Sequence, residues 1–290
     1  MKLNEMRLIR QSAVVVLAGS MLAVSAGAQQ STQQPAQGAA QQSGQQPAQE
    51  TAPKTVPTPG IPSTGFARLD QYRASRVPLL LDDYGQLARY RAADEELKAG
   101  AAVAERVVFF GDSITDGWKL ENYFPGKPYV NRGIGGQTTP QMLVRFRQDV
   151  IDLKPKEVVI LAGTNDIAGN TGPIRNEDIQ ADLATMAELC KAHGIAVVFS
   201  SILPVHNYTP KALDFFAQRP MKRILEMNEW LKGYCAKNGI VYLDYFSALV
   251  DKQGLLMRGL AEDGLHPNDA GYKIMARLAE AAIVKASTAR

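Results

Sequence analysis

The fold of this 290-residue chain is decided by the stretch Val107-Val108-Phe109-Phe110-Gly111-Asp112-Ser113-Ile114-Thr115-Asp116-Gly117-Trp118. Its first four residues are β-branched or aromatic, a composition typical of a short buried strand. Gly111 and Asp112 favour a turn, so we expect the strand to end there. Ser113 would then lie at the carboxyl end of a central strand, where open α/β sheets bind ligands. Taken alone, the stretch fits equally well an Asp112 or Ser113 that only caps a helix.

Strand and helix patterns alternate along the rest of the chain. Candidate strands are residues 106–110, 129–131, 157–162, 196–203 and 240–245, and candidate helices are residues 140–153, 176–193, 220–238 and 268–285. The strands are mostly continuous apolar runs, as in parallel strands buried on both faces. Gly194 and Gly239 directly follow two of the helices, which is typical of helix C-termini. The sequence therefore predicts an α/β fold with a parallel sheet covered by helices on both faces.

The N-terminal quarter has a different composition. Residues 1–28 combine a basic start, an uncharged apolar run and Ala26-Gly27-Ala28, the pattern of a secretory signal cleaved before Gln29. An uncleaved anchor is the alternative, although the run is short for a membrane span. No cysteine follows it, which argues against a lipid anchor. We expect export to the periplasm or the medium, with no stable membrane span after cleavage.

Three further segments follow the expected signal. Residues 29–65 are rich in Gln, Pro, Ala and Ser and cannot bury enough apolar surface to fold, so we expect a disordered linker. Residues 66–103 show helical periodicity and predict an extension of one or two helices. Residues 104–290 hold the alternating pattern and form the expected catalytic domain.

Charge and cysteine content exclude several classes of protein. The net charge is +3, of which Lys2, Arg7 and Arg10 against Glu5 contribute +2, so nothing indicates binding to nucleic acid or to a membrane surface. Two cysteines cannot form a disulfide framework or a zinc site by themselves. Cys190 and Cys235 fall on the apolar faces of predicted helices, which favours buried free thiols. A single disulfide is the alternative in an oxidising compartment.

Polar segments follow the first three strands and precede the last helix. They are Gly111-Asp112-Ser113, residues 131–138, Gly163-Thr164-Asn165-Asp166 and Asp263-Gly264-Leu265-His266-Pro267. In a parallel sheet these ends converge at one edge. Each segment alone could be only a turn, a cap or a loop, and the glycine-rich one could be a phosphate-binding nest.

Together these segments carry the groups needed for acyl transfer. Ser113 would be the nucleophile and His266 its base, because an unperturbed histidine has a pKa of about 6.5. Asp263 could hold the imidazole in the required tautomer. The backbone amides of Ser113 and Gly136 and the side-chain amide of Asn165 could stabilise the oxyanion. No metal or cofactor is required.

The combination resembles the SGNH, or GDSL-like, hydrolase superfamily over residues 104–285. Gly111-Asp112-Ser113-Ile114 is similar to the first block, Gly163-Thr164-Asn165-Asp166 to the third and Asp263-Gly264-Leu265-His266-Pro267 to the fifth. Gly136 matches the second-block glycine, with Gly135 as an alternative one residue away.

The resemblance implies a flavodoxin-like three-layer α/β/α fold with a five-stranded sheet and hydrolysis of esters or thioesters without cofactors. The lysophospholipase and acetylhydrolase branch is the nearest match. It implies acyl or acetyl esters, including lysophospholipid-like lipids, as substrates, with acetylated sugars as the alternative.

Competing interpretations make different demands on the sequence. An α/β-hydrolase would need a Gly-x-Ser-x-Gly string, which does not occur. A phosphoester hydrolase using the glycine loop would need metal ligands or basic residues near it, and a binding protein on this scaffold would have a blocked pocket.

Three further side chains are candidates for lining the substrate site. Trp118 and Arg132 flank catalytic blocks, and His206 follows a strand on the active side. For Trp118 the alternative is ordinary packing, and for Arg132 a salt bridge. Residues 207–219 are a candidate substrate-binding loop or lid.

Overall fold

The computed structural model of the protein describes residues 60–288, so the expected signal and all but the end of the expected linker lie outside the described residues. Five strands form one sheet: β1 (Val107–Gly111), β2 (Tyr129–Gly133), β3 (Glu157–Leu161), β4 (Ala196–Ser200) and β5 (Val241–Leu243). All pair in parallel, in the order β2-β1-β3-β4-β5. This confirms the predicted five-stranded parallel sheet, and the strand order is that of flavodoxin-like folds.

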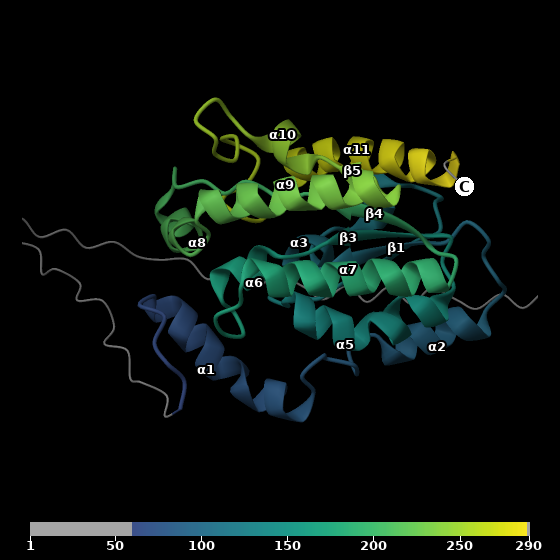
Figure 1. Cartoon of the computed structure of the whole chain (residues 1–290), viewed down its shortest axis with the longest axis horizontal. Coiled ribbons are helices and arrows are strands. Elements are labelled where there is room, and N and C mark those ends of the chain that lie inside the picture. Colours follow the sequence, from purple (N-terminus) through teal and green to yellow (C-terminus); the bar gives the residue numbers. More distant parts are fainter. Residues whose placement is uncertain (1–59, 289–290) are drawn as a thin grey trace, which may run out of the picture. The chain divides into compact units, whose positions relative to one another are not determined.

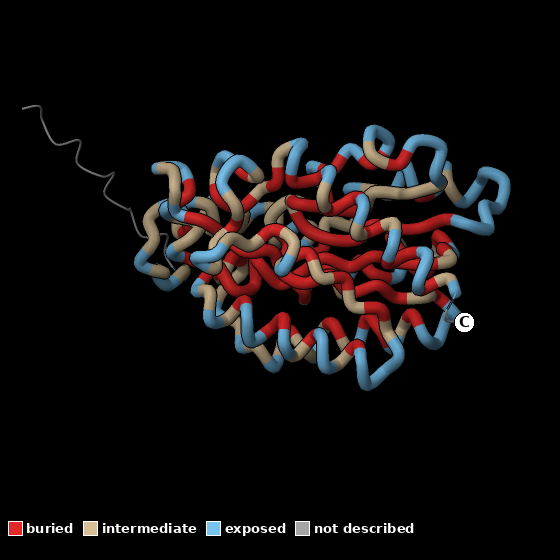
Figure 2. The backbone as a smooth tube through the Cα atoms, turned by 90° about the horizontal axis from the view of Figure 1, so that it is seen from above, coloured by how far each residue is buried: buried red, intermediate tan, exposed pale blue. Residues whose placement is uncertain are grey.

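Helices cover both faces of this sheet (Figure 1). On one side lie α5 (Thr139–Asp149), α7 (Asn176–Ala192) and α9 (Met221–Asn238), and on the other lies α11 (Asp269–Thr288). Alternate residues of β1 enter the two cores: Val108 and Phe110 pack with the first group, and Val107 and Phe109 pack with α11. Every residue of β1 is buried, and the strands form the buried interior of the fold (Figure 2). The expected three-layer α/β/α architecture is therefore present.

The strand β4 is shorter than the apolar run of residues 196–203 that predicts it. After β4, Ser201 still donates its amide to Leu243 O, at 2.9 Å. The next residue is instead held by a side chain of α9, because Asn228 accepts from Ile202 N at 2.8 Å and donates to Ile202 O at 2.9 Å. The chain thus leaves the ladder while remaining buried, so hydrophobicity alone overestimates the strand.

The predicted helical extension contains two helices, α1 (Ala67–Asp82) and α2 (Arg91–Ala99). Short helices fill the connections: α3 (Ser113–Asp116), α4 (Leu120–Tyr123), α6 (Thr164–Ala168), α8 (Leu213–Ala217), α10 (Tyr245–Leu249) and the 3-10 turns η1 (Ile151–Leu153) and η2 (Pro210–Ala212). The predicted loop at residues 207–219 therefore holds η2 and α8.

Two predictions made from composition can be compared with the fold. Cys190 and Cys235 are buried free thiols, as expected from their place on apolar helix faces. Burial raises the pKa of both thiols to about 12.

Among residues 60–288, no helix is both long enough and apolar enough to cross a membrane.

Candidate active site

The end of β1 places Ser113 at the start of α3. Gly111 closes the strand in a space that admits no side chain, since a Cβ there would collide with Thr115 Oγ1 and lie 2.7 Å from Leu161 O. Asp112 then caps α3 by accepting from Ile114 N at 2.9 Å. Asp112 is thus the cap of α3, and the Ser113 hydroxyl is left to contact another segment.

That hydroxyl contacts His266, which lies just before α11. Ser113 Oγ is 2.8 Å from His266 Nε2, and His266 Nδ1 is 2.6 Å from Asp263 Oδ2. Asp263 Oδ1 also accepts from the amides of Leu265 and His266, at 3.0 and 2.9 Å. Burial alone would raise the pKa of Asp263, but these hydrogen bonds from the His266 ring and the two amides hold it well below its usual value. The carboxylate therefore stays ionised and can support a cationic imidazole.

Three groups with a free N–H belong to residues that line one cavity with Ser113. Within residues 60–288, the backbone amides of Ser113 and Gly136 have no hydrogen-bond partner. The side chain of Asn165 donates one N–H to Gln137 O, at 3.1 Å, which leaves the second N–H of its amide available. Gly135, the alternative to Gly136, already donates its amide to Asp116 Oδ2 at 3.0 Å. The geometry therefore favours Gly136 over Gly135 as an oxyanion donor.

These groups open into a cavity of about 400 Å³. Ser113, His266, Gly136 and Asn165 form part of its wall. Most of the remainder comes from α1 and from the segment around α8: Arg68, Leu69, Tyr72, Arg76, Lys211, Asp214, Phe215, Gln218 and Arg219. Gly135, Asn170 and Leu265, from other connecting segments, complete the wall. The site is thus built from the carboxyl ends of the strands and from two elements that cover them.

The three additional lining candidates lie outside this cavity wall, which corrects the expectation for each. Trp118 is 2% exposed and stacks on Tyr272 with ring centroids 5.2 Å apart, so it packs in the core. Arg132 is buried, and its Nη2 is 2.7 Å from Asp94 Oδ1, so its charge is already paired. His206 is buried with Nε2 2.8 Å from Ala261 O. All three side chains are engaged by the fold itself.

The structure also brings in residues that sequence analysis missed. They are Leu69, Tyr72 and Arg76 of α1, which match no motif. The only sequence signal for them is the helical periodicity of residues 66–103. Arg219, just after α8, lies instead within residues 207–219, the predicted substrate-binding loop or lid. The proximity of the three α1 residues to Ser113 depends on how α1 docks.

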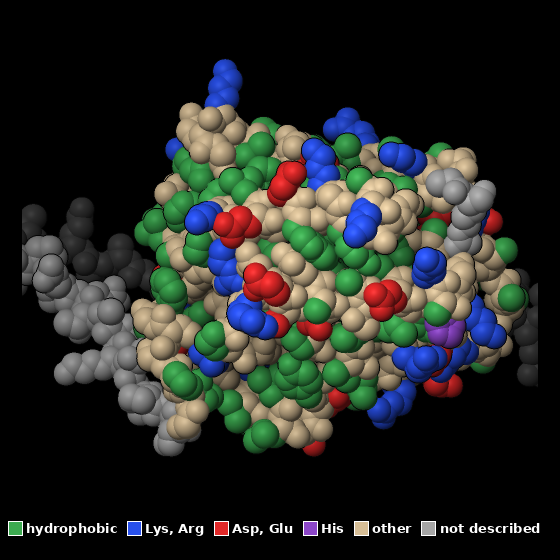
Figure 3. Space-filling view, viewed as in Figure 1, with side chains coloured by type: hydrophobic (Ala, Val, Ile, Leu, Met, Phe, Trp, Pro, Cys, Tyr) green, Lys and Arg blue, Asp and Glu red, His purple; other side chains and the backbone are tan. Residues whose placement is uncertain are grey.

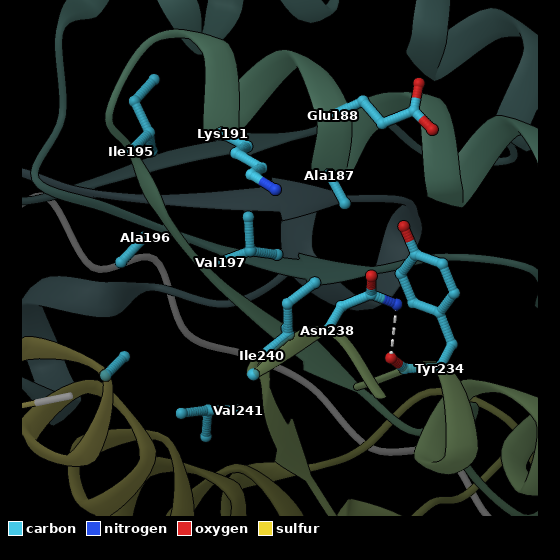
Figure 4. A pocket seen from close by; sticks show the side chains of 12 residues that line it. Ala187, Glu188, Lys191, Ile195, Ala196, Val197, Tyr234, Asn238, Ile240 and Val241 are labelled. Atoms are coloured by element: carbon cyan, nitrogen blue, oxygen red, sulfur yellow. Dashed lines mark hydrogen bonds between the residues drawn. The ribbon is translucent and has the colours of Figure 1, made fainter. Parts of the chain in front are cut away.

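A second pocket lies at the opposite end of the sheet (Figure 4). It is lined by the ends of α7 and α9 and the starts of β4 and β5, including Lys191, Tyr234 and Asn238. Asn238 donates to Tyr234 O at 2.8 Å. None of the candidate catalytic, oxyanion or substrate-lining residues lines it. On the face seen in Figure 3, cationic and anionic side chains are interspersed, with no field of a single sign.

The sequence model of the GDSL-like Lipase/Acylhydrolase family matches residues 109–274, more than half of the chain. The chain belongs to this family. A crystal structure from Bacteroides fragilis, described as that of an acylhydrolase, is 39% identical with a TM-score of 0.65. It covers 72% of this GDSL-like chain and 99% of its own.

Two sequence relatives have informative names. The acetylxylan esterase of Geobacillus stearothermophilus is 26% identical over 207 residues, 60% of this chain and 91% of that protein. The uncharacterized lipoprotein YqeF of Bacillus subtilis is 34% identical over 134 residues, 40% of this chain. The match spans 55% of the length of YqeF, little more than half of that relative.

Proposed function

We propose that this GDSL-like protein is an exported serine esterase that hydrolyses small carboxylic esters. The observation that carries the proposal is the hydrogen-bonded series Ser113, His266 and Asp263 opening into the cavity beside three donors. Membership of an acylhydrolase family supports the reaction class. The basic start and apolar run of residues 1–28 support export, as does a relative named a lipoprotein.

The proposed reaction proceeds in two steps. Ser113 Oγ attacks the ester carbonyl carbon while His266 Nε2 takes the hydroxyl proton. The amides of Ser113 and Gly136 and the side chain of Asn165 stabilise the oxyanion. The bond to the alcohol then breaks, His266 protonates the alcohol, and the acyl group remains on Ser113. Water attacks the acyl-enzyme with His266 as base, which releases the acid and returns the proton to Ser113.

Acyl or acetyl esters, including lysophospholipid-like lipids, are the proposed substrates. Acetylated sugars are a specific alternative, because one relative is named an acetylxylan esterase. A non-catalytic binding role is the remaining alternative.

Hydrolysis of p-nitrophenyl acetate, butyrate and octanoate with EDTA present tests this proposal. We expect metal-independent activity that Ser113→Ala lowers in kcat by on the order of 10⁶, without loss of thermal stability. Activity retained by Ser113→Ala would show that the nucleophile is misassigned. Absence of hydrolysis, together with failure of a fluorophosphonate to label Ser113, would instead favour the binding role.

A further inference from the structure

The helix α1 contributes to the site although it lies outside the region matched by the family. The family match begins at residue 109, whereas α1 ends at Asp82. The hydroxyl of Tyr72 lies so close to Gly136 that a Cβ at position 136 would collide with it. Leu69, one turn earlier, is buried and also lines the cavity. This helix therefore adds a wall beside a proposed oxyanion donor.

The wall of the cavity has an excess of positive charge. Its basic side chains are Arg68, Arg76, Lys211 and Arg219, and among the described residues that line it only Asp214 is acidic. Asp214 is already paired with Arg68, at 3.1 Å. Beyond that pair, the cavity wall offers no carboxylate to the other three cations.

Two of these three cations are left for a ligand. Arg219 is committed to neighbours in the fold, donating to Thr164 Oγ1 at 2.9 Å and to Asn165 Oδ1 at 3.2 Å. Arg76 donates to the neutral Gln86 Oε1 at 3.2 Å. Neither Arg76 nor Lys211 has an ion-pair partner within residues 60–288. An unpaired guanidinium and ammonium in one cavity wall form a site complementary to an anion.

The position of Lys211 indicates which half of the ester would carry the charge. His266 must face the alcohol oxygen in order to protonate it. The ring of Phe215 meets the His266 ring edge-on, with centroids 5.8 Å apart. Lys211 lies in η2, which leads directly into the helix that carries Phe215. Because Phe215 packs on the ring that would protonate the alcohol, we place Lys211, four residues earlier in the chain, on the side of the alcohol.

We propose that Arg76 and Lys211 bind an anionic group, a carboxylate or a phosphate, carried by the alcohol portion of the ester. This inference rests on the proposed esterase function and deepens it by naming a substrate class. Arg76 suits either a carboxylate or a phosphate, because its planar guanidinium can donate hydrogen bonds to two oxygens of the group at once.

Matched acetate esters test the proposal: p-acetoxybenzoate, p-acetoxyphenyl phosphate and the neutral methyl p-acetoxybenzoate. Each kcat/KM is divided by the rate constant for alkaline hydrolysis of the same ester, which removes differences in leaving-group reactivity. For at least one anionic ester, this normalised kcat/KM of the wild type should be roughly tenfold higher than for the neutral ester. The difference should arise from a lower KM. Arg76→Gln and Lys211→Gln should each reduce this preference roughly three- to tenfold, since each variant removes one charge-assisted contact to the anionic group. The two anionic esters show whether the site selects a carboxylate or a phosphate.

Arg73→Gln is the matched control, because Arg73 lies on the same helix but does not line this cavity. It should leave the preference unchanged. Equal normalised kcat/KM values for all three esters would overturn the inference while leaving the esterase proposal intact. The same conclusion would follow if Arg76→Gln and Lys211→Gln lowered kcat/KM equally for every ester.

Calorimetric binding of the three esters to Ser113→Ala separates this inference from the proposed function. Tighter binding of an anionic ester, weakened by Arg76→Gln and Lys211→Gln, would support the anion site even if the wild type showed no turnover. Equal binding of all three esters would overturn it.

Discussion

Arg219 Nη2 donates a hydrogen bond to Asn165 Oδ1 at 3.2 Å, and this contact fixes which end of the Asn165 amide faces the cavity. With its oxygen engaged by a buried guanidinium, Asn165 must present its NH₂ toward Gln137 O and the space beside Ser113. Burial lowers the pKa of Arg219 to about 10, so this side chain remains a cationic donor at neutral pH. Arg219 is therefore a positioning residue for the proposed oxyanion donor.

Replacing Asn165 with Ala should lower kcat roughly 10²–10³-fold, the usual effect of losing one oxyanion donor. Arg219→Lys keeps the charge but cannot bond Thr164 and Asn165 together in the same planar geometry, and we expect a loss of roughly tenfold in kcat with little change in KM. In the Asn165→Ala background, Arg219→Lys should have no further effect on kcat. An equal loss in both backgrounds would mean that Arg219 acts by another route.

The neighbouring glycines Gly135 and Gly136, of which Gly136 is the proposed oxyanion donor, should respond differently to alanine. Gly136 has a φ of 79°, and its added Cβ would meet the Tyr72 hydroxyl. At Gly135 the nearest atoms to an added Cβ are Asp116 Oδ2 at 3.6 Å and Ser113 Cβ at 3.8 Å, which are ordinary contacts. We expect Gly136→Ala to lower kcat/KM by at least roughly 100-fold, the effect of misplacing one donor. Gly135→Ala should stay within a few-fold of wild type, and the reverse order would assign the donor to Gly135.

Breaking the buried ion pair between Asp94 of α2 and Arg132 of β2 should strongly destabilise the fold. Their side chains are 2% and 6% exposed. Asp94→Ala would leave Arg132 buried without its counter-ion, which typically costs about 3–5 kcal/mol in the free energy of unfolding. Lys273→Ala, which breaks the exposed pair with Asp269, should cost under about 1 kcal/mol. Chemical denaturation of both variants compares the two values, and similar losses would contradict this prediction.

Asp166 should make folding stability depend on pH. Its Oδ1 accepts from the amide and hydroxyl of Thr139, at 2.9 and 2.7 Å, but burial raises its pKa to about 6. An unfolded Asp titrates near about 3.9, so between these two pKa values the folded state binds more protons. Stability must therefore fall as pH rises from about 4 to about 6, by up to about 3 kcal/mol from this group.

Asp166→Asn should flatten this part of the stability profile, because the amide oxygen can accept the same hydrogen bonds without titrating. Asp94 and Asp112, whose pKa values burial also raises to about 6, leave a residual slope in both proteins. Urea unfolding at several pH values measures the difference. Parallel profiles for wild type and variant would show that Asp166 does not contribute.

Local sequence was enough to predict the sheet and the main chemical groups. The apolar strands are continuous because both faces are buried, and that pattern appears directly in the residues around Val108 and Val158. Ser113 and Asn165 lie immediately after strands, and Asp263 and His266 are three residues apart, so their spacing reflects short-range geometry. These features depend on neighbours in the chain.

Contacts between distant segments could not be predicted in the same way. His206 and Trp118 have the chemistry of site residues, yet each is turned into the core by partners far along the chain, Ala261 and Tyr272. Arg132 forms an ion pair with Asp94 of the helical extension and does not line the cavity. A side chain's direction depends on which segments pack against it, and a local pattern does not contain that information.

The sequence by itself thus determined the parallel sheet, the groups at its carboxyl edge and the order in which they occur. Tertiary structure alone decided that Gly136 rather than Gly135 keeps a free amide, that Arg219 orients Asn165, and that α1 brings Tyr72 and Arg76 to the site. The physical reason is that strand formation and turns follow from backbone preferences and local burial. A cavity wall instead depends on how separate elements pack together.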